Sequence, residues 1–240
     1  METTINNSTE ILPAPPAEPD LPARQKRSNA SQNQRISAGI ARAAAFCAVL
    51  EHDPELAALL EPRLHAAEEL TMGKQLTQNA QLALTRRQSL MGQEDEVLAE
   101  VKRLCILVRT DLVDFREVAR ARLLTAGSDA ALGLEDSLSK ERGKLVVQAR
   151  ITYTTAKESA YQVVLSRSGY STATLDGLLS DVSDLENART HNTQAQGAAE
   201  RATTERNQAY EALSEWHSTT KRIVRRTLRE RPDLLHKLGM

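Results

Sequence analysis

The fold is decided by the stretch EDEVLAEVKRLCILVRTDLVDFREVARARL, residues 94–123. Its apolar side chains recur every three or four residues and so share one face of an α-helix: Val97, Val101, Leu104, Val108, Leu112, Phe115 and Ala119. The acidic residues at its start, Glu94 to Glu96, suit the positive end of a helix dipole. We expect a long amphipathic helix that begins after Gly92 and buries its apolar face.

Outward from this stretch, the positions of the prolines allow further long helices. Five of the eight prolines lie in the first 30 residues, and none lies between Arg63 and Arg231. Because proline interrupts helix hydrogen bonding, the proline-free part of the chain permits uninterrupted helices. The first 30 residues have few large apolar side chains and are predicted to be disordered.

Apolar spacing predicts several more helices. Asp53 and Pro54 are expected to stop the first, over about residues 31–51, and to start a short one. Pro62 is expected to open the next helix, which runs to about residue 91. A fourth helix is expected over 134–168, although residues 151–155, Ile-Thr-Tyr-Thr-Thr, have the composition of a strand. A fifth is expected from about 173 to 231. The stripe of the first helix consists of Ile36, Ile40, Ala43, Cys47 and Leu50.

Two features leave alternatives open. Between residues 186 and 208 the only apolar side chains are alanines. They allow either close helix packing or a weakly packed waist between two bundle segments, with Gly197 as its flexible point; the waist is preferred. Residues 50–56 and 228–234 both break at a proline and resume as a short apolar turn, which indicates either an internal repeat or shared helix-stop chemistry.

Together these patterns predict an all-α protein. The expected architecture is an elongated antiparallel bundle of about five long helices behind a disordered N-terminal tail. We predict a proline-rich tail at 1–30, an N-terminal helical segment at 31–133 and a C-terminal helical segment at 134–240, packed in the same bundle. Aromatic residues make up only 3% of the chain, and helices pack well with the Ala, Leu and Val that replace them.

Composition also bears on partners and location. A formal net charge of -1 over 240 residues argues against a globally basic nucleic-acid-binding protein. Cys47 and Cys105 stand alone in apolar helical segments and are predicted to be buried thiols. No secretory signal is visible, and no apolar run is long enough to span a bilayer, so the predicted location is the cytoplasm.

Sequence motifs of enzyme sites are missing. The chain has no G-x-S-x-G elbow, no glycine-rich phosphate loop and no H-E-x-x-H pair. Glu61, His65 and Glu69 follow one another at four-residue intervals and could ligate a metal from one helix, but a solvated face with ion pairs is the simpler interpretation. We therefore predict no catalytic, cofactor-binding or metal-binding residues, no cofactor and no enzymatic activity.

A local excess of positive charge marks residues 221–240, which hold seven Lys or Arg against two acidic residues. Five of the basic residues fall on the helix face opposite Ile223, Val224 and Leu228: Lys221, Arg222, Arg225, Arg226 and Arg229. They are candidates for binding an anion or a partner. Lys and Arg are also favoured at any helix C-terminus by the helix dipole.

The leading functional hypothesis is a non-catalytic structural or scaffolding protein that acts through self-association or protein–protein contacts. The alternative is a binding module for anionic surfaces, membrane or nucleic acid, that uses the basic helix face. A homo-oligomer or another helical protein is the favoured partner. Nucleic acid is less favoured because no aromatic side chains interleave with the basic residues, and membrane because no helical hairpin is apolar enough to insert.

Overall fold

The computed structural model describes residues 23–123 and 128–240, with side chains over 31–123 and 130–240. The regular structure in these ranges is entirely helical, so the predicted all-α fold is confirmed. The chain divides into two compact units, unit 1 over Met1–Thr77 and Leu213–Met240 and unit 2 over Gln78–Ala212. This division follows contacts in space, whereas the predicted segments 31–133 and 134–240 are consecutive in sequence and stay a prediction.

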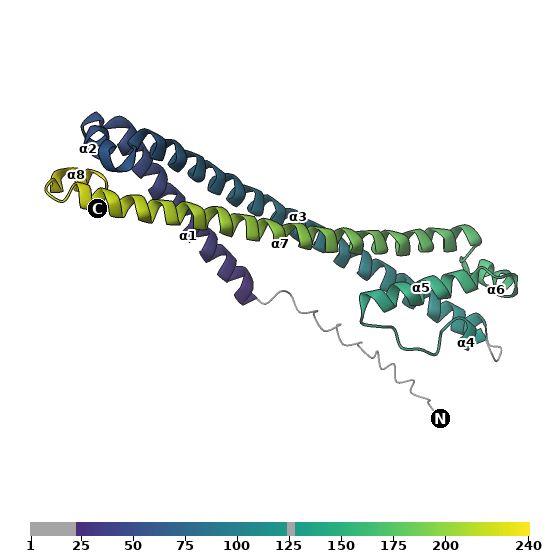
Figure 1. The fold of residues 1–240 in the computed structure, drawn as a ribbon. Coiled ribbons are helices and arrows are strands. Elements are labelled where there is room, and N and C mark those ends of the chain that lie inside the picture. Colours follow the sequence, from purple (N-terminus) through teal and green to yellow (C-terminus); the bar gives the residue numbers. More distant parts are fainter. Residues whose placement is uncertain (1–22, 124–127) are drawn as a thin grey trace, which may run out of the picture. The chain divides into compact units, whose positions relative to one another are not determined.

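Unit 1 contains α1 (Ala23–His52), α2 (Pro54–Leu64), the start of α3 (Ala66–Arg122), the end of α7 (Thr172–Thr227) and α8 (Pro232–Lys237) (Figure 1). The predicted stripe of the first helix is confirmed, since all five of its side chains are at most 5% exposed. Helix α1 begins at Ala23, so the last eight residues of the predicted tail are helical; residues 1–22 of that tail lie outside the described residues.

The centre of unit 1 is the packing of Trp216 from α7 against α1 and α3. Its ring meets the ring of Phe46 edge to face at a centroid distance of 6.1 Å. A methyl group at Gly73 on α3 would lie 2.3 Å from the Trp216 ring, so only glycine allows this approach. The indole N–H donates a hydrogen bond to the Glu69 carboxylate at 2.6 Å. Trp216 is therefore a buried anchor of unit 1, 8% exposed.

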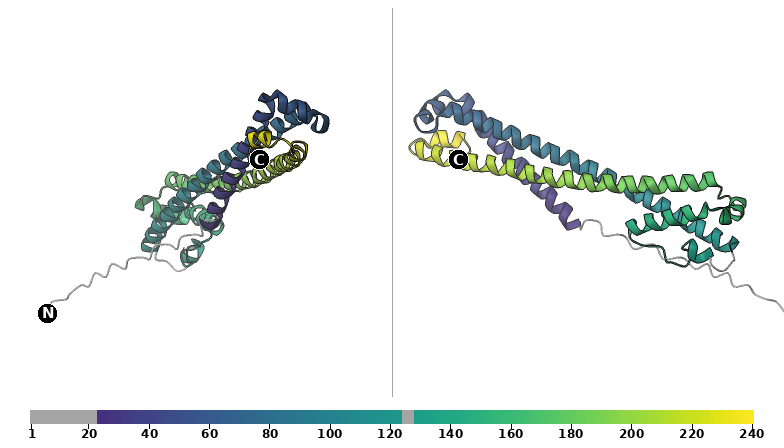
Figure 2. Two further views of the ribbon diagram at one scale, coloured as in Figure 1. Left: turned by 90° about the vertical axis from the view of Figure 1, so that its left-hand side faces the viewer. Right: turned by 45° about the vertical axis from the view of Figure 1, so that its right-hand side comes forward.

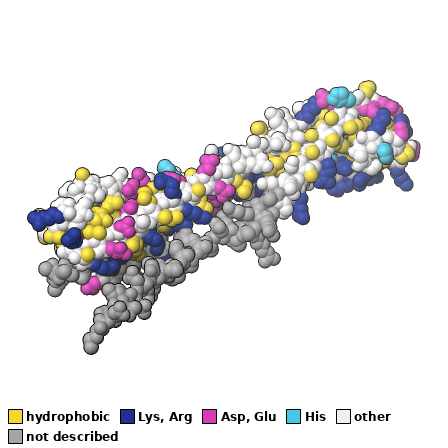
Figure 3. All heavy atoms as spheres, turned by 180° about the vertical axis from the view of Figure 1, so that it is seen from behind, with side chains coloured by type: hydrophobic (Ala, Val, Ile, Leu, Met, Phe, Trp, Pro, Cys, Tyr) yellow, Lys and Arg dark blue, Asp and Glu magenta, His cyan; other side chains and the backbone are white. Residues whose placement is uncertain are grey.

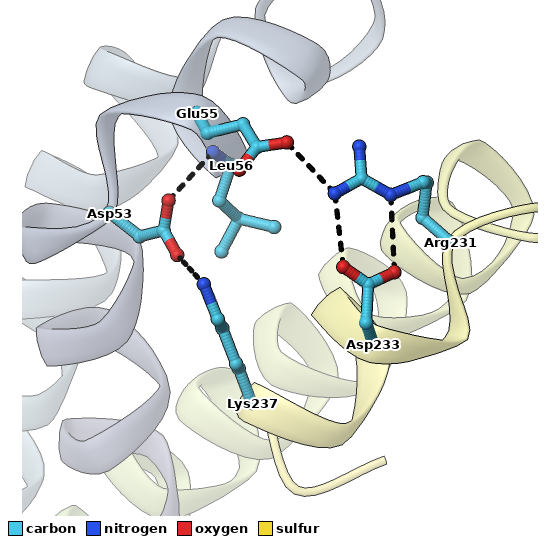
Figure 4. A network of polar contacts seen from close by, with 6 residues as sticks. All are labelled: Asp53, Glu55, Leu56, Arg231, Asp233 and Lys237. Atoms are coloured by element: carbon cyan, nitrogen blue, oxygen red, sulfur yellow. Dashed lines mark hydrogen bonds and ion pairs between the residues drawn. The ribbon is translucent and has the colours of Figure 1, made fainter.

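Two similar helix stops meet in unit 1. Asp53 caps α2, accepting a hydrogen bond from the Leu56 backbone N–H at 3.1 Å, and Pro54 and Pro232 each occupy the first turn of a short helix. Figure 4 shows two ion pairs that join these stops, Lys237 with Asp53 at 2.9 Å and Arg231 with Glu55 at 2.8 Å. The two stretches that resemble each other in sequence are therefore neighbours in space.

Unit 2 contains the rest of α3, α4 (Ser128–Ala131), α5 (Arg142–Ala156), α6 (Ser159–Leu165), the 3₁₀ helix η1 (Ser166–Ser168) and α7 up to Ala212. Figures 1 and 2 show α5 alongside the unit 2 parts of α3 and α7. Helices α3 and α7 are antiparallel there, since Arg86 pairs with Glu205 at 3.0 Å while the next residue, Arg87, donates to the earlier Thr203. The apolar face of residues 94–123 lies in the core, with Phe115 fully buried.

The prediction of a helix start after Gly92 is wrong, because α3 runs through Gly92 without a break. A glycine inside a helix costs only about 1 kcal/mol, which packing on both sides of it offsets. The predicted opening of a helix at Pro62 is also wrong. Pro62 lies inside α2, and the break comes at His65, whose backbone is left-handed with a φ of 44°.

The predicted fourth helix, 134–168, is divided. Residues 134–141 are irregular, and α5 begins only at Arg142. Arg116 from α3 donates hydrogen bonds to the carbonyls of Gly133, at 2.6 Å, and Asp136, and Arg120 donates to that of Leu134. Carbonyls engaged in this way are satisfied without a helix. The strand-like residues 151–155 are helical within α5.

The alanine-rich part of α7 is helical throughout and packs within unit 2. Ala199 and Ala202 are each 2% exposed, and Arg87 of α3 donates a hydrogen bond to Thr203, the residue after Ala202. Close alanine-mediated packing, the less favoured of the two interpretations of this stretch, therefore describes it. Both cysteines are free, Cys47 buried and Cys105 partly buried, and burial raises the pKa of each thiol.

Candidate docking surface

The basic side chains singled out by the sequence lie together at the end of α7. We call Lys221, Arg222, Arg225, Arg226 and Arg229 the basic strip. The four arginines are exposed and Lys221 is partly exposed. Helix α7 ends at Thr227 rather than near residue 231, so Arg229 lies on the turn that follows the helix. The four strip residues within α7, Lys221 to Arg226, span about 7.5 Å along the helix axis at the helical rise of 1.5 Å per residue.

The strip faces outward because the opposite side of the same helix is anchored in the core. Val224 and Leu228 are at most 1% exposed, and Thr220 is 2% exposed. Spacings of three and four residues keep these buried positions on one side and the strip on the other. In the space-filling view, Lys and Arg side chains gather along one edge of unit 1 (Figure 3).

The strip cations differ from the neighbouring basic residues in having no acidic partner. Arg231 is paired with Glu55 at 2.8 Å and with Asp233 at 3.0 Å, and Lys237 is paired with Asp53 (Figure 4). Across the described ranges, no strip side chain forms an ion pair with another described residue. The helix dipole favours basic residues at this end of α7, but it does not replace a carboxylate as a partner for their charges.

The charge of the strip acts on its surroundings. The pKa of His217, one turn before Lys221, is lowered first by burial and then by the positive charges of Lys221 and Arg42. Arg42 comes from α1, so cations from two helices of unit 1 act on the same imidazole. Such a surface attracts an anion more strongly when several charges act together.

An acidic surface that the sequence did not predict lies on unit 2. We call Asp111 and Asp114 of α3 and Asp181 of α7 the acidic patch. None of the three forms an ion pair with another residue in the described part of the chain. Burial raises the pKa of Asp111, and the charges of Asp181 and Asp114 raise it further. Asp111 is therefore the member of the patch on which both other carboxylates act.

Aromatic side chains lie next to the acidic patch. Tyr153 and Tyr170 both pack edge to face on Phe115, one turn from Asp111, at centroid distances of 5.5 Å and 5.0 Å. The Tyr153 hydroxyl is buried, has no hydrogen-bond partner, and belongs to a side chain that is 1% exposed. Burial raises the pKa of Tyr153, and Asp111 is the carboxylate that raises it most.

Replacing Asp111 with asparagine is expected to stabilise the protein at pH 7 by about 0.5 kcal/mol, because it removes a partly buried charge and its like-charge interactions with Asp181 and Asp114. Since the pKa of Asp111 is raised above its unfolded value, the folded state takes up this proton first as the pH falls. The gain should therefore disappear near pH 3, where both states hold the proton. Urea unfolding of Asp111→Asn at the two pH values measures it, with Glu117→Gln on the exposed face of α3 as control. A gain that is equal at both pH values would contradict the prediction.

The metal candidates Glu61, His65 and Glu69 do not share a helix face. His65 ends α2 in the left-handed region, Glu61 accepts a hydrogen bond from the Ala66 N–H at 2.9 Å, and Glu69 is engaged with Trp216. Within the residues that the structure describes, no three His, Cys, Asp or Glu side chains are placed to hold a metal ion.

Hydropathy and comparison with known proteins add two findings. None of the helices in the described ranges combines the length and the apolar character that a membrane span needs. The chain matches no protein-family model, no curated protein and no solved structure, so its function has to be inferred from its own residues.

Proposed function

We propose that this protein is a scaffold that docks on an acidic protein surface through the basic strip. The observation that supports the proposal is the set of five strip cations on one outward face of α7 that have no acidic partner among the described residues. The proposal joins the leading sequence-based hypothesis, a scaffolding protein, to the residues of its alternative. It includes the predicted cytoplasmic location, which fractionation of expressing cells would test.

Arginine chemistry suits this role. Four of the five strip residues are arginines, whose planar guanidinium groups can donate two parallel hydrogen bonds to one carboxylate. Exposed ion pairs contribute little one at a time, so stable docking needs several of them on a preformed surface. The buried Val224 and Leu228 fix the helix that carries the strip, which reduces the entropy lost on binding.

Two observations favour a protein partner over nucleic acid or membrane. Trp216, the aromatic residue nearest the strip in the sequence, is buried and offers no ring for base stacking. The apolar side of this part of α7 is already covered by the core, so the helix has no free apolar face to place in a bilayer.

Reversing two strip charges tests the proposal. The variant Arg225→Glu, Arg226→Glu is expected to lose its retention on immobilised poly-glutamate at about 10 mM salt, where the Debye length is about 30 Å. Wild-type retention should disappear at about 1 M salt. The matched control is Lys140→Glu, Arg201→Glu, which changes the net charge equally at two exposed positions and should leave retention intact.

Retention of the reversed variant equal to that of the wild type would overturn the proposal. Because glutamate at the end of α7 opposes the helix dipole, Arg225→Gln, Arg226→Gln serves as a milder second variant, and circular dichroism checks that each variant is folded. Retention on double-stranded DNA or on phosphatidylserine vesicles, but not on poly-glutamate, would also overturn it and favour the other classes of partner.

A further inference from the structure

We propose that the acidic patch of unit 2 is the docking site for the basic strip of a second copy of this chain. The ligand class is the guanidinium group of an arginine side chain. The inference rests on the proposed function and names the partner that the strip binds. It joins two surfaces of opposite charge that lie on different units.

The first support is that these two surfaces stand out against the surrounding ion pairs. On unit 2, Arg150 is paired with Glu186 and Lys157 with Asp176, each at 2.6 Å. On unit 1, Lys74 is paired with Glu51, also at 2.6 Å. The strip has five cations and the patch three carboxylates that form no such pair within the described residues. The charge of Asp181 also acts on Arg103, which is itself paired with Glu100 at 2.7 Å. The patch therefore keeps a net negative charge and the strip a net positive charge.

The second support is the chemistry of the acidic patch. Asp111 is partly buried beside two other carboxylates, so its ionised form is disfavoured until a cation approaches. The buried, unpaired Tyr153 hydroxyl and the rings of Phe115 and Tyr170 surround it with material of low dielectric. Attraction between opposite charges is stronger in such surroundings than in water. A guanidinium is the least strongly hydrated of the protein cations and can pack on aromatic faces, which a lysine ammonium does less well.

The third support is that each chain carries one strip and one patch. Contact between a strip and the patch of another chain leaves a strip and a patch unused. These either pair reciprocally, which closes a two-fold dimer, or bind further copies in a ring or filament. Either outcome is self-association, the mode of action that the sequence favours.

Charge exchange between the two surfaces tests the inference. Light scattering coupled to size exclusion at about 10 mM salt is expected to show that wild-type protein associates, and that about 1 M salt returns it to monomer. The strip reversal Arg225→Glu, Arg226→Glu and the patch reversal Asp114→Lys, Asp181→Lys should each weaken association at least tenfold. Asp111 is not changed, because burial already disfavours its charge and a lysine there would place a cation in a partly buried site.

Combining the reversed surfaces separates a specific contact from general charge effects. A chain that carries both reversals has the charges exchanged, with its net charge unchanged, and should associate again. The two singly reversed proteins, each monomeric alone, should associate when mixed, which also shows that the contact joins different chains. The control Lys140→Glu, Arg201→Glu should associate like the wild type.

Several outcomes would overturn the inference. They are a wild-type monomer at every concentration, association that survives both reversals, or a doubly reversed chain that stays monomeric although circular dichroism shows it folded. In each case the poly-glutamate assay gives a separate result. If strip reversal still abolishes retention there, the proposed function stands and the partner is a different acidic protein. If it does not, the proposed function fails as well.

Discussion

Replacing Trp216 with alanine is expected to lower the free energy of unfolding of the protein by about 3–5 kcal/mol, the usual cost of emptying a large aromatic site. The indole is 8% exposed and lies against Phe46 and Gly73. Its loss leaves a cavity at the centre of unit 1 and a Glu69 carboxylate without its 2.6 Å hydrogen bond. Urea unfolding followed by circular dichroism measures the change, with Trp216→Phe expected to lose less.

The contact with Gly73 makes this prediction sharper. In the wild type, Gly73→Ala should destabilise, since its methyl group would lie 2.3 Å from the indole and overpacking costs about 1–3 kcal/mol. In the Trp216→Ala background the same substitution should cost less, because only the 2.9 Å contact with the Cys47 sulfur remains and alanine is favoured over glycine in a helix by about 1 kcal/mol. A double-mutant cycle measures this difference. Equal effects of Gly73→Ala in both backgrounds would show that the Trp216 ring does not lie on Gly73.

Replacing Arg116 with methionine is expected to lower the free energy of unfolding by about 2–4 kcal/mol. Arg116 is 5% exposed and donates hydrogen bonds to the Gly133 and Asp136 carbonyls. Methionine keeps much of the volume but leaves two carbonyl acceptors unpaired, each at a cost of about 1–3 kcal/mol when it stays buried. Burial lowers the pKa of Arg116, because its charge is partly desolvated in the folded state. Removing that charge relieves the desolvation cost and so offsets part of the loss.

Thermal and urea unfolding measure how much Arg116→Met lowers the free energy of unfolding, and hydrogen exchange shows which residues are affected. Exchange should accelerate between residues 133 and 141 before it does in α3. Arg122→Met, an exposed residue at the end of the same helix, is the control and should change stability by less than about 0.5 kcal/mol. An Arg116→Met protein as stable as this control would mean that the arginine does not hold the 133–141 segment in solution.

Most of the fold could be predicted because its signals are local. The stripe of α1 and the buried face of α3 repeat every three or four residues, and Asp53 with Pro54 carries its own capping chemistry. The errors arose where contacts distant in sequence decide the backbone. The helix expected from residue 134 gives way to irregular structure because arginines of α3 take its carbonyls, and spacing within residues 134–141 cannot reveal that.

Of the two candidate surfaces, only one could be predicted from the sequence. The basic strip could be found from sequence because its five residues are close together on one helix face. The acidic patch could not, since Asp181 joins Asp111 and Asp114 only through the antiparallel packing of α7 on α3. The three-residue spacing of Asp111 and Asp114 is a local signal, but exposed acidic pairs are common on helices.

Unit 1 is built from two separate stretches of the chain, so its core cannot be completed until the second stretch has been synthesised. Residues 78–212 form unit 2 as one uninterrupted stretch, whereas unit 1 needs Leu213–Met240 to complete a core begun by α1 and α2. At about 5–20 residues per second, a ribosome takes roughly 7–27 s to make the intervening residues. During that interval Phe46 has no Trp216 ring packed against it. The nascent chain therefore presents apolar side chains to chaperones until its last helices emerge.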